Sequence, residues 1–415
     1  MKIGDFARKY GLNITTVRYY VDKALLTPER KNNQYIFNRS CMEDMEKILK
    51  YKEYRFSLEE IELLFFLEKT SKFRDETVLQ IISQLLAQKK AELQREQQSV
   101  LKAIKKLDLE IENFSTMTPK ESDEEDRNGL PFSFLPYLYC PKCKTPLRLE
   151  SASIANNKLT KGELLCDCGY QAEINDGVIL CEGHSESTPF KAFDNIRSVS
   201  AITEEFSNEY RILIDKTYLW MYHNLPESTQ PQNILAGPFS FNFLLKYCQR
   251  FPDSATFIVV DPSLKRIAKL QSYMKEFDFQ TVYIAGNMDA VPLREACADI
   301  YIDDFSATNC IFTYNRSKYR FIAPLLKKGC IIAGIFAEYN KAPKSLANFK
   351  EDHPDFLPEK MTFSHLKADM KSVGINLTER KEIGSTTGNE KHFQRHLPGE
   401  QISVLGYKAI KERKT

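Results

Sequence analysis

Hydrophobic residues follow a seven-residue period over one long stretch of the chain. Residues 75–114 contain no proline or glycine, and an apolar side chain occupies every seventh position. These positions are Leu79, Leu86, Leu93, Val100, Leu107 and Phe114. Such a repeat over five intervals predicts a helix that dimerises as a coiled coil. The alternative is a single amphipathic helix that packs on its own domain.

The C-terminal half alternates short apolar runs with amphipathic segments. The runs have the length of buried strands. The predicted strands cover residues 233–237, 257–261, 281–285, 298–304 and 330–335, with helices at 241–250 and 264–277. Strands that alternate with helices predict a doubly wound, Rossmann-like α/β sheet over residues 195–415. Residues 375–380 and 402–410 are expected to add a closing pair of strands.

The N-terminus has the pattern of two short helices joined by a tight turn. The first helix is predicted over Ile3–Tyr10, a turn follows at Gly11, and Asn13 is a suitable cap for a second helix that begins at Ile14. This is a helix-turn-helix, whose second helix can enter the major groove of DNA. The basic segment after Pro28 predicts a β-hairpin wing.

Four motifs in this region resemble those of the MerR family of bacterial transcription regulators. They are Ile3-Gly4-Asp5-Phe6-Ala7, Val17-Arg18-Tyr19-Tyr20, Leu25-Leu26-x-Pro28 and Phe56-Ser57-Leu58-Glu59-Glu60-Ile61. Residues 1–72 therefore resemble a MerR-type winged helix-turn-helix domain. Many family members have Gly-Tyr-Arg in the wing, where this chain has Gln34-Tyr35-Ile36. The alternative is an unrelated helical hairpin that binds protein.

The resemblance implies a homodimer that binds an operator with two related half-sites. MerR proteins pair through an antiparallel coiled coil, and they distort promoters with an overlong spacer so that RNA polymerase can engage. A small-molecule effector is a further expected partner. The residues expected to contact DNA are Thr15, Thr16, Arg18, Tyr19, Tyr20, Lys23, Arg30, Lys31 and Tyr35.

Chain length and net charge add to the interpretation of the protein as a DNA-binding regulator. A chain of 415 residues with 42% hydrophobic and 27% charged residues predicts several globular domains. The net charge is only +2, so the basic charge that DNA requires must be local. We expect a cytoplasmic protein without a membrane partner, because no apolar run approaches the roughly 20 residues of a membrane span and no signal peptide is evident.

An acidic linker is predicted between the long helix and the rest of the chain. Residues 115–130 are rich in Ser, Thr, Pro, Glu and Asp, and Glu121–Asp126 is strongly acidic. This composition is typical of a solvated tether, which we place at residues 115–133.

Four of the ten cysteines form two close pairs. Cys140-Pro-Lys-Cys143 and Cys166-Asp-Cys168 each place two thiolates on one tight turn, and two such turns complete a tetrahedral Zn²⁺ site. Residues 134–185 are therefore predicted to form a zinc ribbon with a structural ion, similar to the small zinc modules of some methyltransferases. Because a CxC pair is narrower than the commoner CxxC, Cys181 or His184 is the alternative for one ligand.

The order of elements after residue 195 resembles the class I S-adenosylmethionine-dependent methyltransferases. In that family a glycine-rich turn follows the first strand, an acid ends the second strand and accepts the ribose hydroxyls, and residues after the third strand hold the adenine. The resemblance places Gly237, Asp261, Asn287 and Met288 at these positions. Asn287 replaces the usual acid, and its amide oxygen can still accept a hydrogen bond. The alternative for Asp261 is a helix N-cap.

The first of these motifs departs from the family. Only Gly237 remains of the G-x-G-x-G run, the usual acid is absent, and Phe239 and Phe241 would crowd the methionine tail of the ligand. No known catalytic motif is evident elsewhere in the sequence. We therefore expect a sensor or effector domain, with S-adenosylmethionine as its candidate ligand. The alternatives are an active methyltransferase that the DNA-binding domain targets, and a zinc-ribbon scaffold that binds RNA or protein.

Overall fold

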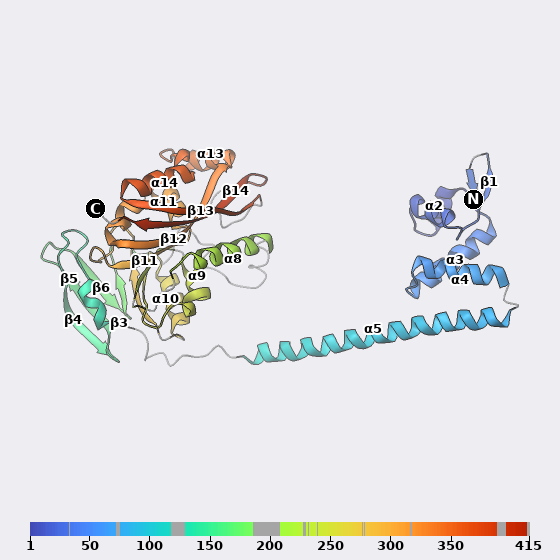
Figure 1. Ribbon diagram of the computed structural model, residues 1–415, viewed down its shortest axis with the longest axis horizontal. Helices are drawn as coiled ribbons and strands as arrows, with labels where there is room; N and C mark the ends of the chain where they lie inside the picture. Colours follow the sequence, from blue (N-terminus) through green and yellow to red (C-terminus); the bar gives the residue numbers. More distant parts are fainter. Residues whose placement is uncertain are drawn as a thin grey trace. The chain divides into compact units, whose positions relative to one another are not determined.

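The chain is divided into two compact units in the computed structural model (Figure 1). The first comprises Met1–Lys120 and the second comprises Glu121–Thr415. The structure describes residues 1–32, 34–71, 75–117, 129–185, 208–226, 230, 232–238, 240–275, 277, 279–315, 318–387 and 396–412. The acidic run Glu121–Asp126 and the side chain of Phe239, both singled out from the sequence, lie outside these residues.

The first unit begins with the predicted helix-turn-helix. Helix α1 spans Ile3–Lys9 and helix α2 spans Ile14–Asp22. Asn13 caps α2 as predicted, because its Oδ1 accepts a hydrogen bond from the backbone N–H of Thr16 at 2.6 Å. Phe6 is fully buried on the inner face of α1, in the core that both helices share.

A β-hairpin and two further helices follow. Strand β1 (Glu29–Lys31) pairs antiparallel with strand β2 (Gln34–Ile36), which confirms the predicted wing. Helix α3 spans Arg39–Glu53 and helix α4 spans Leu58–Ser71. The hairpin, α3 and α4 pack their apolar residues into the same core as α1 and α2.

One long helix, α5, completes the first unit. It spans Glu76–Thr116, and Asp75 caps its first turn. The first turns pack on the core of this unit through Val78, Ile82 and Leu85. Further along the helix, Lys89 pairs with Glu60 at 2.7 Å and Glu96 pairs with Arg55 at 2.9 Å, so the N-terminal half of α5 lies against its own domain, as in the alternative prediction.

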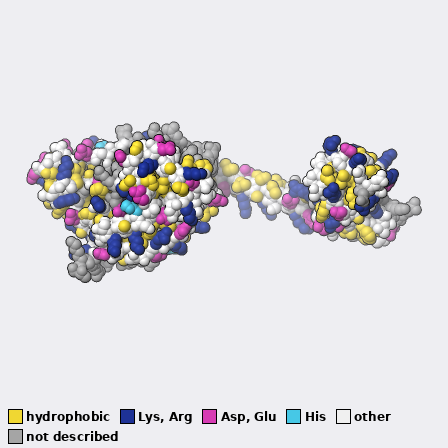
Figure 2. Space-filling view, turned by 90° about the horizontal axis from the view of Figure 1, so that it is seen from above, with side chains coloured by type: hydrophobic (Ala, Val, Ile, Leu, Met, Phe, Trp, Pro, Cys, Tyr) yellow, Lys and Arg dark blue, Asp and Glu magenta, His cyan; other side chains and the backbone are white. Residues whose placement is uncertain are grey.

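Most of the heptad positions of α5 are exposed in the single chain. Val100, Leu107 and Phe114 expose 51%, 61% and 69% of their surface. Figure 2 shows hydrophobic side chains at the surface of this helix. An exposed apolar row of this length leaves a seam that a second helix can cover.

The second unit is built on one large sheet with a parallel centre. The central strands lie in the order β12-β11-β8-β9-β10. Their bounds are β8 Asn233–Ala236, β9 Thr256–Asp261, β10 Gln280–Ala285, β11 Ala298–Asp303 and β12 Leu326–Lys341. The chain moves outward from β8 to β10 and then returns to β11 on the other side of β8. This order is that of a doubly wound sheet, which confirms the predicted fold class.

An antiparallel pair of strands closes one edge. Strand β14 (Gln401–Lys411) lies between β12 and β13 (Ile375–Thr386) and pairs antiparallel with both. The predicted closing strands are therefore confirmed, and both are longer than the sequence indicated.

Helices cover both faces of this sheet. In Figure 1, α11 and α14 lie on one side of the β12–β14 region and α8 lies on the other. The α-helices are α8 Asn208–His223, α9 Phe241–Tyr247, α10 Leu264–Met274, α11 Ser306–Tyr314, α12 Tyr319–Ile322, α13 Pro343–Asp352 and α14 Phe363–Ser372. The 3-10 helices are η2 Cys248–Arg250, η3 Ala323–Leu325 and η4 Pro358–Met361. In the described part of the chain, every helix is too short or too polar to cross a membrane.

The cysteine ribbon extends the opposite edge of the sheet. Its elements are β3 Leu130–Pro131, η1 Phe132–Tyr137, β4 Arg148–Ala155, β5 Lys158–Leu165, β6 Gln171–Asn175 and β7 Val178–Leu180. Strands β4 to β7 pair antiparallel in sequence order, and β7 then pairs in parallel with β10. The ribbon and the Rossmann-like sheet therefore share one hydrogen-bonded sheet.

Helix α8 packs on β14 through the one tryptophan of the chain. Trp220 is buried, and a Cβ atom at Gly406 would lie 2.3 Å from the Cε3 atom of its indole ring. Only glycine allows the strand and the ring to approach this closely.

We predict that Gly406→Ala destabilises the second unit by about 1–3 kcal/mol, because overpacking forces the indole or the strand to shift. Fluorescence of Trp220 during denaturant unfolding reports this unit alone, since no other tryptophan is present. Gly4→Ala is the control, because an added Cβ meets no atom within 4 Å there. An unchanged unfolding midpoint in Gly406→Ala would contradict the close packing.

Candidate functional site

The exposed face of α2 and the wing carries most of the residues expected to contact DNA. Thr15, Arg18 and Tyr19 are exposed on α2, and Arg30 and Lys31 are exposed on β1. The first forty residues hold eight basic and three acidic side chains, so positive charge is concentrated in this domain although the whole chain is nearly neutral. An exposed arginine on the second helix beside a basic wing is suited to phosphate and base contact.

Three of the residues expected to contact DNA are partly buried or are engaged by other side chains. Thr16 is half-buried and its hydroxyl donates to Asn13 Oδ1 at 2.8 Å. Lys23 forms an ion pair with Glu62 at 3.3 Å. Tyr35 is half-buried on the wing.

Tyr20 requires a correction. Its side chain is only 6% exposed and lies in the core of the domain. Adjacent positions of a helix point about 100° apart, so Tyr19 faces solvent while Tyr20 faces inward. Tyr20 is a core residue, and we leave it out of the DNA-contacting surface.

The four cysteines of the ribbon converge on one point. The Sγ atoms of Cys140, Cys143, Cys166 and Cys168 all lie within 4.8 Å of one another. The Cys140–Cys168 and Cys143–Cys166 pairs are 3.4 and 3.3 Å apart. Tetrahedral zinc with Zn–S bonds near 2.3 Å needs sulfur atoms about 3.8 Å apart, so the cluster fits a four-thiolate metal site.

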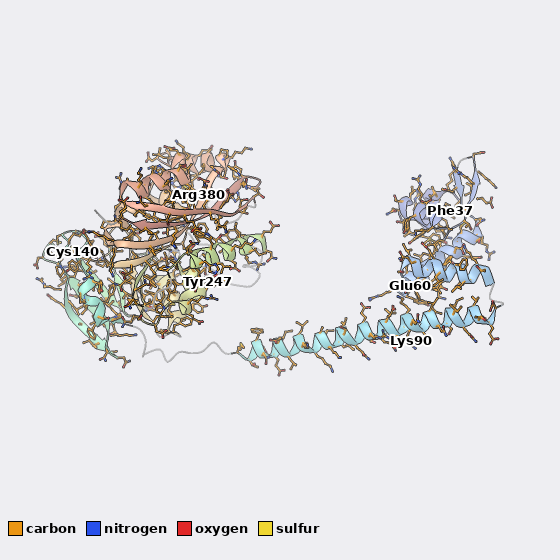
Figure 3. All side chains as sticks on the ribbon, viewed as in Figure 1. Phe37, Glu60, Lys90, Cys140, Tyr247 and Arg380 are labelled. Atoms are coloured by element: carbon orange, nitrogen blue, oxygen red, sulfur yellow. The ribbon has the colours of Figure 1, made fainter. Side chains whose placement is uncertain are left out.

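Two tight turns, one for each cysteine pair, orient these thiol groups. In the first turn, the backbone N–H of Cys140 donates to Thr145 O at 2.8 Å, and Lys144 adopts a left-handed conformation. In the second turn, Gly169 is left-handed with φ 85° and donates to Cys166 O at 3.0 Å. Figure 3 labels Cys140 within this ribbon.

The two alternative ligands lie away from the cluster. Cys181 is buried against Gly286, where an added Cβ would lie 2.8 Å from Cys181 Cβ. The Nδ1 atom of His184 lies 2.7 Å from the backbone oxygen of Cys181. Among the described residues, neither belongs to the group of side chains that could share a metal ion.

The residues that resemble a cofactor site lie at the carboxyl ends of β8, β9 and β10. Gly237 follows β8, and a Cβ atom there would meet the hydroxyl oxygens of Tyr301 and Ser306 at 2.7 and 3.0 Å. Side chains of the protein therefore fill the space beside this turn. Phe241 is half-buried at the start of α9 and packs against the core.

Asp261 ends β9 as predicted, but its carboxylate is engaged by the protein. Oδ1 accepts hydrogen bonds from the backbone N–H of Ser263 at 2.8 Å and from Arg266 Nη2 at 2.7 Å, and Oδ2 accepts from Arg266 Nε at 3.0 Å. Both Asp261 and Arg266 are buried. The cap of α10 is Ser263 and not Asp261, so the N-cap alternative is wrong.

The segment after β7 crosses the same edge of the sheet. The backbone N–H of Cys181 donates to Ala285 O at 2.8 Å, and that of Ser185 donates to Pro262 O at 2.8 Å. Gly183 lies beside Asn287, because an added Cβ would be 3.0 Å from the amide nitrogen. Residues 181–185 therefore lie over the ends of β9 and β10, where the resemblance places ribose and adenine. Met288 is half-buried and packs against the core.

Comparison with known proteins finds a family match at the N-terminal part of the first unit. A family model described as MerR HTH family regulatory protein matches residues 1–65. These residues form a MerR-type helix-turn-helix domain. No curated protein matches the chain significantly.

Solved structures similar to the chain include methyltransferases and the [4+2]-cyclase SpnF, all with low sequence identity. Geranyl diphosphate C-methyltransferase from Streptomyces coelicolor A3(2) is 12% identical, with a TM-score of 0.40 over 55% of this chain and 89% of that chain. A putative methyltransferase from Bacillus halodurans C-125 is 12% identical, with a TM-score of 0.35 over 47% and 99%. Phosphoethanolamine N-methyltransferase 2 from Haemonchus contortus is 12% identical, with a TM-score of 0.37 over 47% and 52%. Because these scores are low, we describe the methyltransferase-like fold from its strand order.

A buried polar network follows β11 in the methyltransferase-like domain, and sequence reasoning missed it. Asp303 accepts hydrogen bonds from Ser306 Oγ at 2.6 Å and from Tyr319 Oη at 2.8 Å, and it pairs with Lys318 and Tyr407. Burial opposes ionisation, but the Lys318 ammonium outweighs it and lowers the pKa of Asp303. The available signal was the pair of acids that ends an apolar strand.

The second of these acids, Asp304, has no such partners. It is 1% exposed, and within the described residues neither carboxylate oxygen makes a hydrogen bond. Burial raises the pKa of Asp304 to about 8, although the nearby Tyr218 hydroxyl opposes the rise. The carboxyl group is therefore protonated at neutral pH.

We predict one zinc ion per chain, held by the four clustered cysteines. Cys168→Ser should lose the ion, whereas Cys181→Ser should retain it because this thiol lies outside the cluster. Binding should weaken on acidification, as protons compete for the thiolates. Metal content after dialysis checks the ratio, and full metal content in Cys168→Ser with loss in Cys181→Ser would reverse the ligand assignment.

We also predict that Asp304 makes stability fall with rising pH. In the unfolded chain this carboxyl ionises near pH 4, whereas in the folded protein it stays protonated up to about pH 8. Between these values the unfolded state alone loses the proton, so its contribution reduces stability by up to about 1.4 kcal/mol per pH unit.

Asp304→Asn removes this titration while keeping the shape of the side chain. Denaturant unfolding followed by Trp220 fluorescence at pH 5 and pH 8 should show a smaller loss of stability in the variant than in the wild type. Equal losses in both proteins would mean that Asp304 does not carry this proton.

Proposed function

We propose that this protein is a homodimeric DNA-binding transcription regulator whose methyltransferase-like domain senses a small molecule. The observation that carries the proposal is the MerR-type domain, with exposed Arg18 and Tyr19 on α2 beside a basic wing. The second helix of such a domain enters the major groove, and the wing reaches the phosphate backbone.

The exposed seam of α5 supports pairing of two chains. Val100, Leu107 and Phe114 each expose about half or more of their surface, and their spacing is that of a coiled-coil seam. A dimer places two copies of α2 in position to bind two related half-sites, at least about one helical turn apart. By analogy with MerR regulators, RNA polymerase at the promoter is the proposed partner of the bound dimer.

A structural zinc ion completes the proposal for the ribbon. Four thiolates satisfy tetrahedral zinc and leave no open position for a substrate. The ion would hold the two cysteine turns together at one end of β4 and β5, and would thereby stabilise β4, whose residues are mostly exposed.

Three features of the methyltransferase-like domain support sensing rather than catalysis. Tyr301 and Ser306 fill the space beside Gly237, Arg266 engages Asp261, and residues 181–185 cover the adenine edge. Methyl transfer needs the donor held within about 3–3.5 Å of the acceptor and in line with it. A site filled by the protein's own groups cannot hold the donor in this way without rearrangement. A ligand that favours one of two arrangements would couple to DNA through the dimer.

We predict that Arg18→Ala weakens operator binding by roughly 1–3 kcal/mol, because an exposed guanidinium on the second helix is lost. Footprinting and titration with selected operator DNA measure the change. Arg320→Ala, an exposed arginine in the second unit, is the matched control and should bind as the wild type does. Wild-type footprints from Arg18→Ala would remove this residue from the interface.

We predict that Leu93→Lys combined with Val100→Lys gives monomers, because charge would have to be desolvated at two seam positions. Gln88→Lys combined with Gln98→Lys adds the same charge at exposed positions outside the seam and should leave the dimer intact. Sedimentation velocity distinguishes the two states. An intact dimer in the seam variant would place the contact elsewhere.

A further inference from the structure

The carboxyl edge between β8 and β11 is where the sheet changes direction. Ile302 of β11 pairs with Ala236 of β8, so Asp304 and the turn after Gly237 lie on the same edge of two adjacent strands. Ser240 follows that turn immediately before α9. In open α/β sheets, ligands bind in the crevice at such a switch point.

Two buried polar side chains at this edge are unsatisfied. Asp304 and Ser240 are 1% and 2% exposed, and within the described part of the chain neither the Asp304 carboxylate oxygens nor Ser240 Oγ makes a hydrogen bond. Burial without a hydrogen-bond partner destabilises the folded state, because the group loses its hydration and gains nothing in return. Both groups follow adjacent strands at the same edge of the sheet, and unsatisfied buried groups at such an edge call for a partner that a ligand can supply.

The surroundings define the chemistry of that ligand. Tyr218 of α8 contacts both Asp304 and Asn242, so a hydroxyl faces the carboxyl group from a third element. The charge of Lys318 acts on Asp304, but its ammonium is paired with Asp303 and Tyr301. Among the described residues, Asp304 therefore has the Tyr218 hydroxyl beside it and no ion pair of its own.

We propose that Asp304, with Ser240 and Tyr218, binds the amine nitrogen of the small molecule that this domain senses. An alkylammonium group offers three N–H donors and one positive charge, which match a carboxylate and two hydroxyl oxygens. A divalent cation fits poorly, because magnesium and calcium need six or more oxygen ligands and Asp303 is committed to Lys318. The proposal deepens the sensing role given above and depends on it.

Binding of such a ligand moves one proton. Free Asp304 is protonated at neutral pH, and the bound ammonium favours the carboxylate, so the carboxyl O–H bond breaks and the proton passes to the buffer. The ammonium keeps its own three protons as donors. Amine binding at pH 7 should therefore release close to one proton per chain.

The experiment is calorimetric titration of the full-length protein at pH 7 in two buffers of different ionisation enthalpy. The probes are n-butylamine with n-butanol as its neutral match, and S-adenosylhomocysteine with 5′-methylthioadenosine, which lacks the amino-acid end. The first pair tests a simple aliphatic amine, and the second tests the amine of an adenosyl amino acid. We expect one amine-bearing probe to bind at least tenfold more tightly than its match, with proton release.

Asp304→Asn should lose this preference and the proton release, while Asp253→Asn, an exposed acid that precedes β9 at the opposite edge, should retain both. Circular dichroism confirms that each variant is folded. Equal binding of amine and neutral probe, retained preference in Asp304→Asn, or no binding of any probe would overturn the proposal. Operator footprinting without a ligand tests the DNA-binding function separately, so failure of one is distinguishable from failure of the other.

Discussion

Pairing of β7 with β10 determines how the second unit is organised. These two short strands run parallel and join the cysteine ribbon to the Rossmann-like sheet through backbone hydrogen bonds. Because β7 runs parallel to β10, the chain leaves it at the carboxyl edge, the edge where ligands of α/β sheets bind. The chain therefore passes from the ribbon to the carboxyl edge, and a metal ion in the ribbon would stabilise the strands that lead there.

The same pairing supports our proposal that the methyltransferase-like domain senses a ligand. Residues 181–185 continue from β7 over the ends of β10 and β9, and their backbone groups bond to Ala285 and Pro262. Arg266 then satisfies Asp261, whose carboxylate would otherwise be available to a ribose. The edge that remains unsatisfied lies between β8 and β11, at Ser240 and Asp304. This arrangement is the basis of our proposal that the domain recognises a ligand and does not transfer a methyl group from S-adenosylmethionine.

Sequence patterns predicted the helices and strands of this protein better than they predicted its side-chain contacts. The helix-turn-helix, the wing, the long helix and the strand order all depend on local periodicity and caps, so they could be predicted from residues such as Asn13 and the apolar strand at residues 257–261. Convergence of the four cysteines was also predictable, because paired thiols on two tight turns have few other uses. By contrast, the burial of Tyr20, the Arg266–Asp261 pair and the isolation of Asp304 depend on which side chains meet in three dimensions. A single sequence carries no such information.

The central claim is that a MerR-type domain is joined to a methyltransferase-like domain that does not catalyse methyl transfer. The most direct test is to incubate the full-length, zinc-loaded protein with S-adenosylmethionine labelled on its methyl group and with DNA, RNA and protein acceptors, including the operator. The account predicts no transfer above the background without protein. Transfer by the wild-type protein that disappears in Asp261→Ala would contradict it, because the acid at the end of β9 would then be holding a methyl donor.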